Sequence, residues 1–208
     1  MKIQSIVEGH GEVDAVPILL RRLQEAAGAY SITIGRPIRR HSSDLNSRDR
    51  FQNAVRLALL QDECSAVLIL FDCEDDCPKT KAAELTAWAQ EVSGATPCEV
   101  VLAYREYESW FLAALESLRG KSAISETAQP PDEPEARRNA KGALEEWMPH
   151  THSYSETLDQ PGLTAAFDLA LAYQRSRSFR RMVSAFGRHV RALGLTLDEW
   201  PPSAWLAE

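Results

Sequence analysis

The chain of 208 residues is predicted to fold as an α/β protein, with a mostly parallel sheet flanked by helices. Three observations predict this class. Short apolar or β-branched segments alternate with longer segments of helical periodicity over the first 120 residues. Residues 66–71 (AVLILF) form a continuous apolar run, which is typical of a strand buried on both faces of a parallel sheet. The first apolar segment runs into a glycine-containing turn at residues 8–12, as expected where a strand hands over to a helix.

The predicted elements of this part alternate in the order β-α-β-α-β-α-β-α. Strands are expected at residues 2–7, 30–35, 66–71 and 98–103. Helices are expected at residues 14–27, 51–60, 79–92 and 111–118. Asp14 is expected to cap the first helix, because a carboxylate can accept hydrogen bonds from the free N–H groups there. Residues 36–50 carry five arginines and are expected to form a surface loop.

The composition changes after Gly120, and this change predicts two parts. Residues 121–138 hold three prolines among polar residues and read as a linker. Helical periodicity returns at residues 139–148 and 164–193. We therefore expect an α/β domain over residues 1–120, and a linker with a helical appendage packed on it over residues 121–208. Trp200 and Trp205 lie in a proline-rich tail that is expected to cover an apolar groove of this chain or of a partner.

Charge and composition exclude some classes of function. Lys plus Arg is 23 and Asp plus Glu is 30, so the formal charge is 23 − 30 = −7, which argues against a protein that coats nucleic acid electrostatically. An enzyme that acts on nucleic acid stays open, since bound metal can neutralise an acidic site. No apolar run approaches the roughly 20 residues of a membrane span. The four cysteines form no CxxC pair, which favours reduced thiols in a cytoplasmic protein.

Acidic residues follow three of the predicted strands. Glu8 follows the first, Asp72 and Glu74 follow the third, and Glu106 and Glu108 follow the fourth. Ligands of open parallel sheets bind beyond the carboxyl ends of the strands, so these carboxylates are expected to converge. Such a cluster needs a cation, and hard oxygen ligands suit Mg²⁺ or Mn²⁺.

For some acidic residues of these turns, a capping role at the next helix explains the position at least as well as metal binding. These residues are Glu12, Asp75 and Asp76.

Two of these motifs resemble those of Toprim domains, which occur in topoisomerases, bacterial primases and several nucleases. Glu8-Gly9 is similar to the first Toprim motif, and Asp72-Cys73-Glu74 to the second, with Glu74 in place of the usual second Asp. The rest of the chain resembles the domain-of-unknown-function family 4276 through three ordered segments. They are residues 105–112 (REYESWFL), Ala140-Lys141 with Tyr154, and residues 176–180 (SRSFR).

The resemblance implies a Toprim-like, metal-dependent nuclease that cleaves phosphodiesters of DNA or RNA. Some relatives act in bacterial anti-phage defence and are encoded beside an ABC-type ATPase, which makes such an ATPase an expected partner. Asp72 and Glu74 are expected to hold Mg²⁺ or Mn²⁺, with Glu8 completing a second metal site or acting as general base. Glu108 is either a further ligand or simply a carboxylate at a helix start.

Further residues are expected to contact the substrate. Gly9 and Gly11 would let the backbone turn tightly near a phosphate. Arg105 and Lys141 are candidates for a catalytic cation by their position. Arg177 and Arg181 lie on one face of a basic helix and suit contacts to the phosphate backbone, although a solvated face explains them equally well.

Two other functions stay open. The acidic balance and the Asp-to-Glu departure at Glu74 favour a non-catalytic Toprim-like protein that docks on an ATPase. A primase-type nucleotidyl transferase is disfavoured, because the chain has no zinc-binding or second polymerase module. The oligomeric state is open, with a homo-oligomer among the alternatives.

Overall fold

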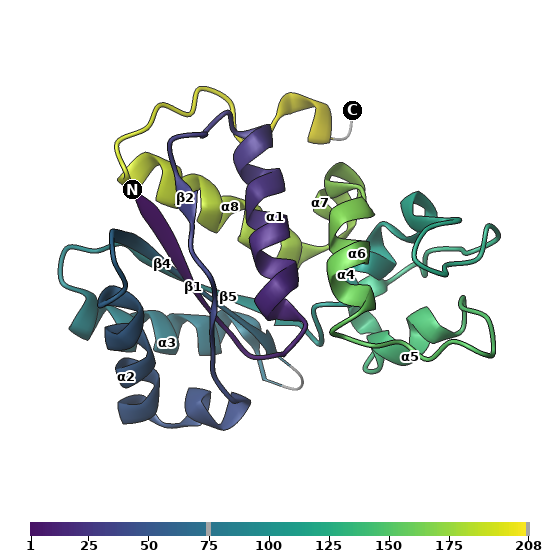
Figure 1. The fold of residues 1–208 in the computed structure, drawn as a ribbon, viewed down its shortest axis with the longest axis horizontal. Coiled ribbons are helices and arrows are strands. Elements are labelled where there is room, and N and C mark those ends of the chain that lie inside the picture. The colour runs from purple at the N-terminus through teal and green to yellow at the C-terminus, as the bar shows by residue number, and fades with distance from the viewer. Residues whose placement is uncertain (74–75, 207–208) are drawn as a thin grey trace.

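The computed structural model describes residues 1–73 and 76–206, and it confirms the predicted α/β class. Five parallel strands form one sheet in which β1 pairs with β2, β3 and β4, and β4 pairs with β5 (Figure 1). The strands are β1 (Lys2–Val7), β2 (Thr33–Ile34), β3 (Ile38–Arg39), β4 (Cys64–Cys73) and β5 (Cys98–Tyr104). The helices are α1 (Glu12–Ala26), α2 (Arg48–Leu59), α3 (Pro78–Ser93), α4 (Ser109–Ala113), α5 (Ala140–Glu145), α6 (Asp159–Ala166), α7 (Leu169–Arg175) and α8 (Arg177–Ala192).

Helices cover both faces of the sheet, because successive side chains of a strand point to opposite faces. Leu68 and Leu70 of β4 join one buried cluster with α1 and α8. Val67 and Ile69 join a second cluster with α2 and α3. Figure 1 shows these two helix pairs on opposite sides of the sheet. The apolar run at residues 66–71 is therefore buried on both faces, as its composition predicts.

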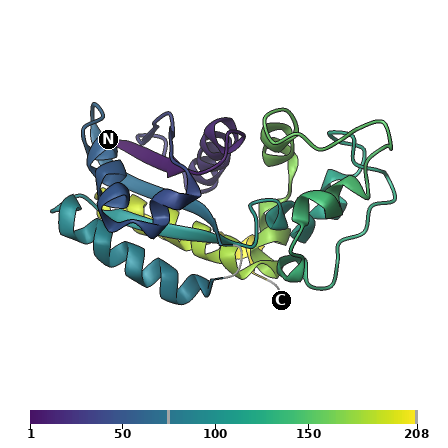
Figure 2. The same ribbon diagram turned by 90° about the horizontal axis from the view of Figure 1, so that it is seen from below.

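The C-terminal helix α8 belongs to the covering layer of the sheet. It packs on β5, and its strongly amphipathic sequence buries Met182, Val183, Phe186 and Val190 in the same cluster as α1. The shorter helices α4–α7 gather beyond the carboxyl ends of the strands, where Figure 2 shows them as a separate group. One buried core thus joins residues on both sides of Gly120.

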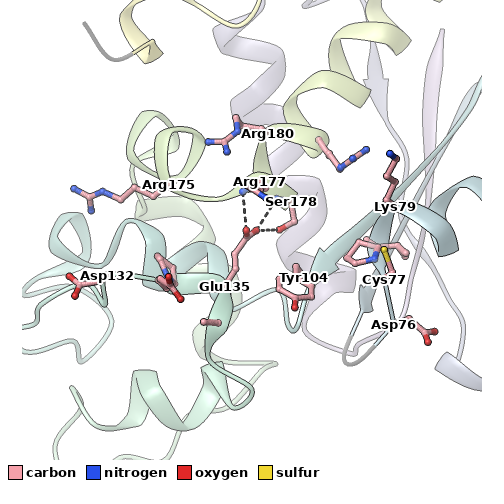
Figure 3. A pocket seen from close by; sticks show the side chains of 16 residues that line it. Asp76, Cys77, Lys79, Tyr104, Asp132, Glu135, Arg175, Arg177, Ser178 and Arg180 are labelled. Carbon is pink, nitrogen blue, oxygen red and sulfur yellow. Dashed lines mark hydrogen bonds between the residues drawn. The ribbon is translucent and has the colours of Figure 1, made fainter.

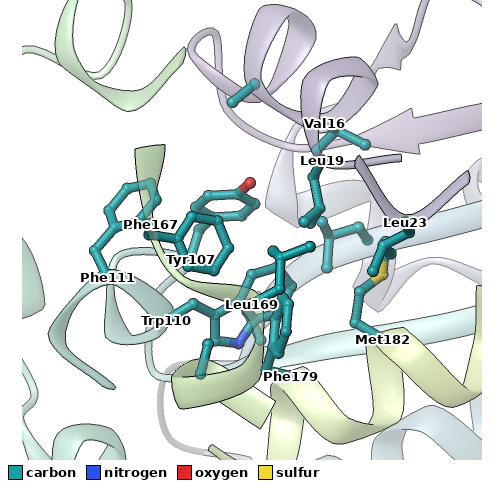
Figure 4. Close-up of a cluster of buried hydrophobic side chains, with 14 of the residues drawn as sticks. Val16, Leu19, Leu23, Tyr107, Trp110, Phe111, Phe167, Leu169, Phe179 and Met182 are labelled. Carbon is teal, nitrogen blue, oxygen red and sulfur yellow. The ribbon is translucent and has the colours of Figure 1, made fainter. Parts of the chain in front are cut away.

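Edge-to-face aromatic contacts hold that group of short helices together (Figure 4). Trp110 of α4 packs on Phe179 of α8 with ring centroids 5.3 Å apart, and Phe179 packs on Phe167 at 5.6 Å. The Trp110 indole also donates a 2.7 Å hydrogen bond to Ser178, so its polar atom is satisfied inside the core.

Two local predictions are wrong. Helix α1 begins at Glu12 with Gly11 as its N-cap, so Asp14 lies inside the first turn and does not cap it. The expected loop at residues 36–50 contains β3, a 3₁₀ turn (Ser42–Asn46) and the start of α2. The stretch 164–193 is helical as predicted, and it is divided among three helices because Asp168 and Ser176 cap new helices with their side chains.

The proline-rich tail covers a groove of its own chain. The Trp200 indole donates a 2.8 Å hydrogen bond to the Val183 carbonyl and lies 5.8 Å from the Phe186 ring. Gly187 leaves the space for it, since a Cβ there would collide with the Trp200 ring. Within the described residues, no helix is both long and apolar enough to cross a membrane.

Candidate active site

The strand order places a switch point between β1 and β4. After β1 the chain first adds β2 and β3 on one side, and then crosses to add β4 and β5 on the other. Helical connections leave on opposite faces at such a point and open a crevice at the carboxyl ends of the two strands. Glu8 directly follows β1, and Asp72 is the next-to-last residue of β4.

Glu12 locks the turn that carries Glu8. Its carboxylate accepts hydrogen bonds from the backbone N–H groups of Glu8 (2.9 Å) and Gly9 (3.1 Å). The side chain is 3% exposed. Burial raises the pKa of Glu12 to about 8, although the two N–H donors oppose the shift and the neighbouring Glu108 and Glu8 add to it. Glu12 therefore carries its proton through much of the neutral range.

Asp72 is held at the same edge from the other strand. Its Oδ1 atom accepts a 2.9 Å hydrogen bond from the Tyr107 backbone N–H, which follows β5. Burial raises the pKa of Asp72 well above its ordinary value, and Glu12, Glu108 and Glu8 raise it further. This mutual influence shows that the four carboxyl groups share one small region, which we call the acidic cluster.

Glu108 completes the acidic cluster from the N-terminus of α4. It is fully buried, and its Oε1 atom accepts hydrogen bonds from the Tyr154 hydroxyl (2.7 Å) and the Gln160 amide (3.0 Å). Its Oε2 atom is buried and has no hydrogen-bond partner among the described residues. Burial raises the pKa of Glu108, while Lys141 and Tyr154 lower it.

Lys141 brings positive charge to the acidic cluster. Its ammonium group pairs with Glu156 at 2.5 Å, and its backbone N–H donates a 3.1 Å hydrogen bond to Glu106. Partial burial would lower the pKa of Lys141, but Glu108, Glu156 and Asp72 together raise it above its ordinary value. Lys141 therefore stays protonated and offsets part of the negative charge of the cluster.

The structure brings together Glu8, Asp72, Glu108 and Lys141 of the predicted site residues. Glu74 lies outside the described residues. Gly9 belongs to the turn fixed by Glu12.

Gly11 is needed for packing between chain segments. A Cβ there would overlap the Glu156 carbonyl oxygen and the Gln160 side chain.

The predicted basic residues do not form one group. Arg105 adopts a left-handed backbone conformation (φ 69°), and its guanidinium lies 4.8 Å from the centre of the Tyr104 ring. Arg177 and Arg181 line a different pocket together with Tyr104. The acidic cluster therefore has Lys141 as its neighbouring cation, and the other three belong to its surroundings at the sheet edge.

The donor chemistry of the acidic cluster fits a hard divalent cation. Carboxylate oxygens are the ligands that Mg²⁺ and Mn²⁺ prefer, and the unpartnered Oε2 of Glu108 is a buried acceptor that a cation would satisfy. Across residues 1–73 and 76–206, however, no three His, Cys, Asp or Glu side chains already stand in a metal-holding arrangement. A metal at this site accordingly remains a prediction.

Three residues of the site were not predicted as such. Glu12 was explained as a helix cap, although its place four residues after Glu8, across a glycine turn, is a signal for side-chain contact with that turn. Tyr154 belongs to a family segment but had no role assigned. Gln160 carries no sequence signal, because only the docking of α6 brings it to Glu108.

The fold and the acidic cluster define an α/β protein with a carboxylate site at the switch point of a parallel sheet. The family model described as Domain of unknown function (DUF4276) matches residues 7–186, and the chain belongs to this family. No curated protein and no solved structure matches the chain. The matched region includes Glu8, Asp72, Glu108 and Lys141, so the whole cluster falls within the family domain.

Proposed function

We propose that the protein is a Toprim-type nuclease that hydrolyses phosphodiester bonds of DNA or RNA with Mg²⁺ or Mn²⁺. The observation that carries this proposal is the convergence of Glu8, Asp72 and Glu108 at the switch point, with Lys141 beside them. A fold tolerates repelling, half-desolvated carboxylates where a cation binds them.

Within this proposal the acidic residues have two roles, metal binding and general base catalysis. Asp72 and Glu108, together with Glu74, would hold the metal. The metal would supply positive charge to the phosphate oxygens and lower the pKa of bound water. Glu8 is partly exposed, unlike the buried Glu12 and Glu108, and suits the role of the general base that takes the proton from the attacking water.

The surrounding residues keep this machinery in place. Glu12 fixes the Glu8 turn through two backbone N–H groups. Tyr154 and Gln160 donate hydrogen bonds to Oε1 of Glu108 and fix the carboxylate. The Oε2 atom has no hydrogen-bond partner in the described chain and is available for a cation. Lys141 is placed to neutralise negative charge that a phosphate group brings to the cluster.

The experiment is a cleavage assay on labelled single- and double-stranded DNA and RNA with Mg²⁺ or Mn²⁺. The wild-type protein should cleave at least one of these substrates. Glu8→Ala should lower the rate at least about a hundredfold, the range typical of losing a general base. Asp72→Asn should also lower the rate strongly, because it removes a ligand of the metal. The matched control is Asp62→Asn, since Asp62 is exposed, precedes β4 at the end away from Asp72 and lies outside the acidic cluster. Equal cleavage by wild type and Glu8→Ala would contradict the proposal.

The resemblance also motivates a role in anti-phage defence with an ABC-type ATPase as partner. Calorimetric titration with Mg²⁺ and Mn²⁺ separates this nuclease from a protein that only docks on such an ATPase. The nuclease should bind metal at millimolar concentration and lose that binding in Asp72→Asn. Absence of metal binding by the wild type would favour the docking protein.

A further inference from the structure

A second pocket opens at the free edge of the sheet. Its volume is about 870 Å³, and it lies between the N-terminal ends of α3 and α8, closed on a third side by residues 132–136 (Figure 3). This volume is within the range of small-molecule and cofactor sites. None of the four carboxyl side chains of the acidic cluster lines it. We call it the edge pocket.

The edge pocket adjoins the acidic cluster through the sheet. In the register of β4 and β5, Asp72 pairs with Ala103, and the next pair is Cys73 with Tyr104. Tyr104 lines the edge pocket, whereas Asp72 belongs to the cluster. Successive residues of a strand point to opposite faces of the sheet, so Tyr104 and Asp72 lie on different faces. A ligand that leaves the pocket has to pass around the carboxyl ends of β4 and β5 to reach the candidate active site.

Five basic side chains line the edge pocket, and two of them are already engaged. Arg175 pairs with Glu116 at 2.6 Å, and Arg180 donates to the carbonyls of Tyr173 (3.0 Å) and Gln174 (2.9 Å). The other three are exposed and make no ion pair with any described carboxylate. They are Lys79, Arg177 and Arg181.

The most enclosed acid of the pocket is held by hydrogen bonds within the protein. The Glu135 carboxylate accepts four hydrogen bonds at the start of α8, and Figure 3 shows those from Arg177 and Ser178. Its donors are the Ser176 hydroxyl (2.7 Å), the Arg177 N–H (3.0 Å), and the N–H (2.8 Å) and hydroxyl (2.6 Å) of Ser178. Asp76, Asp132 and Glu133 are exposed, and Figure 3 shows Asp76 directed away from Lys79. Repulsion of an anion near Lys79 is thereby limited.

The remaining lining is apolar and aromatic. It includes Tyr104, Leu102, Pro78 and Pro134. Phosphate-binding cations beside an aromatic surface are the combination that single-stranded nucleic acid requires, because its phosphates need positive charge and its exposed bases need flat apolar surfaces. A duplex is too wide to enter a cavity of this size.

We propose that the edge pocket binds one or two nucleotides of a single nucleic-acid strand. Lys79, Arg177 and Arg181 contact the phosphates, Tyr104 packs on a base, and the strand continues toward the acidic cluster. This inference rests on the proposed nuclease function and adds the substrate class to it: a single strand or a frayed end.

The test measures binding without chemistry. A short fluorescent single-stranded oligonucleotide is titrated in EDTA with wild type, with the Arg177→Ala/Arg181→Ala double variant, and with Arg191→Ala. Arg191 is an exposed arginine of the same helix outside the pocket, so it controls for the general loss of charge. The double variant should bind at least about tenfold more weakly, with a salt slope reduced by about 0.7 for each lost phosphate contact. Arg191→Ala should stay within about twofold of wild type.

Cys77 provides a local reporter of occupancy. It is an exposed thiol in the pocket wall, whereas Cys73 is buried. Hydrogen bonds from Thr80 and Lys79 at the start of α3 lower its pKa, which favours alkylation at neutral pH. The oligonucleotide should slow iodoacetamide labelling of Cys77, followed by mass spectrometry, in the wild type and not in the double variant.

The outcomes separate the two proposals. The proposed nucleotide binding in the pocket is wrong if the wild type cleaves without protection of Cys77, or if the double variant and Arg191→Ala bind equally. Neither result contradicts the proposed nuclease function. Protection of Cys77 that is abolished in the double variant supports the pocket even if no substrate is cleaved. Equal protection by a mononucleotide overturns the strand assignment, because a free nucleotide would then be the ligand.

Discussion

Among the described residues, the Tyr107 N–H holds Asp72 in the acidic cluster by donating a hydrogen bond to its Oδ1 atom. An asparagine keeps that acceptor and removes the charge. Burial and three neighbouring carboxyl groups all raise the pKa of Asp72, so its charge is unfavourable unless a cation is present. Replacing this one carboxylate therefore tests two effects separately: the loss of stability that its charge causes, and the binding of a metal.

We predict opposite effects of Asp72→Asn with and without metal. In EDTA at pH 8 the variant should be more stable than wild type and melt at a higher temperature, because asparagine removes a charge that burial and the neighbouring carboxyl groups disfavour. Added Mg²⁺ should raise the melting temperature of wild type and leave that of Asp72→Asn unchanged. Thermal melts with EDTA and with Mg²⁺ measure both effects.

Asp76→Asn is the matched comparison. Asp76 is exposed in the following turn, and its loss should cost only a few tenths to about 1 kcal/mol through the N-terminus of α3. The proposed metal site is contradicted if Mg²⁺ still raises the melting temperature of Asp72→Asn, or if Asp76→Asn instead is the variant that abolishes this rise.

The burial of His189 predicts that the protein loses stability in acid. It is fully buried in α8, and neither ring nitrogen makes a standard hydrogen bond within the described chain. Burial lowers its pKa from 6.5 to about 4, while Glu99 and the Val67 backbone oppose the shift. Because the unfolded chain takes up the proton first, the folded state loses roughly 3 kcal/mol as the pH falls from 6.5 to 4.

Chemical denaturation of wild type and His189→Leu at pH 7 and pH 4.5 measures this contribution. Other titrating groups are common to both proteins, so the difference between their pH dependences isolates His189. The wild type should lose at least about 2 kcal/mol more than the variant over this interval. Parallel losses in both proteins would show that His189 does not titrate as its burial requires.

At the scale of elements, the start of α8 depends on a carboxylate from a distant loop. Glu135 satisfies the first N–H groups of the helix, 42 and 43 residues further along the chain, and also the hydroxyls of Ser176 and Ser178. Ser178 in turn accepts the hydrogen bond of the buried Trp110 indole. One side chain thereby attaches the linker to the helix that covers the sheet.

Glu135→Ala should destabilise the protein by about 2 kcal/mol, because it removes a charged acceptor from several donors at once. Glu135→Gln should cost less, since one oxygen remains. Sulfate should partly restore the alanine variant, because an anion can occupy the vacated helix N-terminus. Urea denaturation with and without sulfate tests this, with the exposed Asp132→Ala from the same loop as control. A Glu135→Ala variant with the same free energy of unfolding as wild type would contradict the stabilising role of Glu135.

At the scale of the whole molecule, α8 forms one layer of the α/β sandwich although it follows the linker. It buries Met182, Val183, Phe186 and Val190 against the face that also packs α1. Without it that face of β4 and β5 would be open to water, at a cost proportional to the apolar area exposed.

A chain that ends at residue 120 should therefore fail to fold cooperatively. Near-ultraviolet circular dichroism during a thermal melt should show a sigmoidal transition for the full chain and none for the shortened one. A shortened chain that melts cooperatively with native-like near-ultraviolet signals would instead establish residues 1–120 as an independent domain.

The local sequence was enough to predict the α/β class and part of the site. The composition of residues 66–71 alone predicts a strand that is buried on both faces. Because β1 and β4 pair in parallel, their carboxyl ends then place Glu8 and Asp72 at the same edge of the sheet. Periodicity also predicted the helices that flank the sheet. These features depend on neighbours a few residues apart, so the sequence by itself contains them.

Only the tertiary structure decided the surroundings of those carboxylates. Tyr154 and Gln160 reach Glu108 across 46 and 52 residues, and Lys141 approaches the cluster only because α5 docks on Glu106. The helical periodicity of residues 164–193 likewise leaves the number of helices open, and two capping side chains divide the stretch among three. Such contacts depend on how distant segments pack together, and no local pattern of residues records that packing.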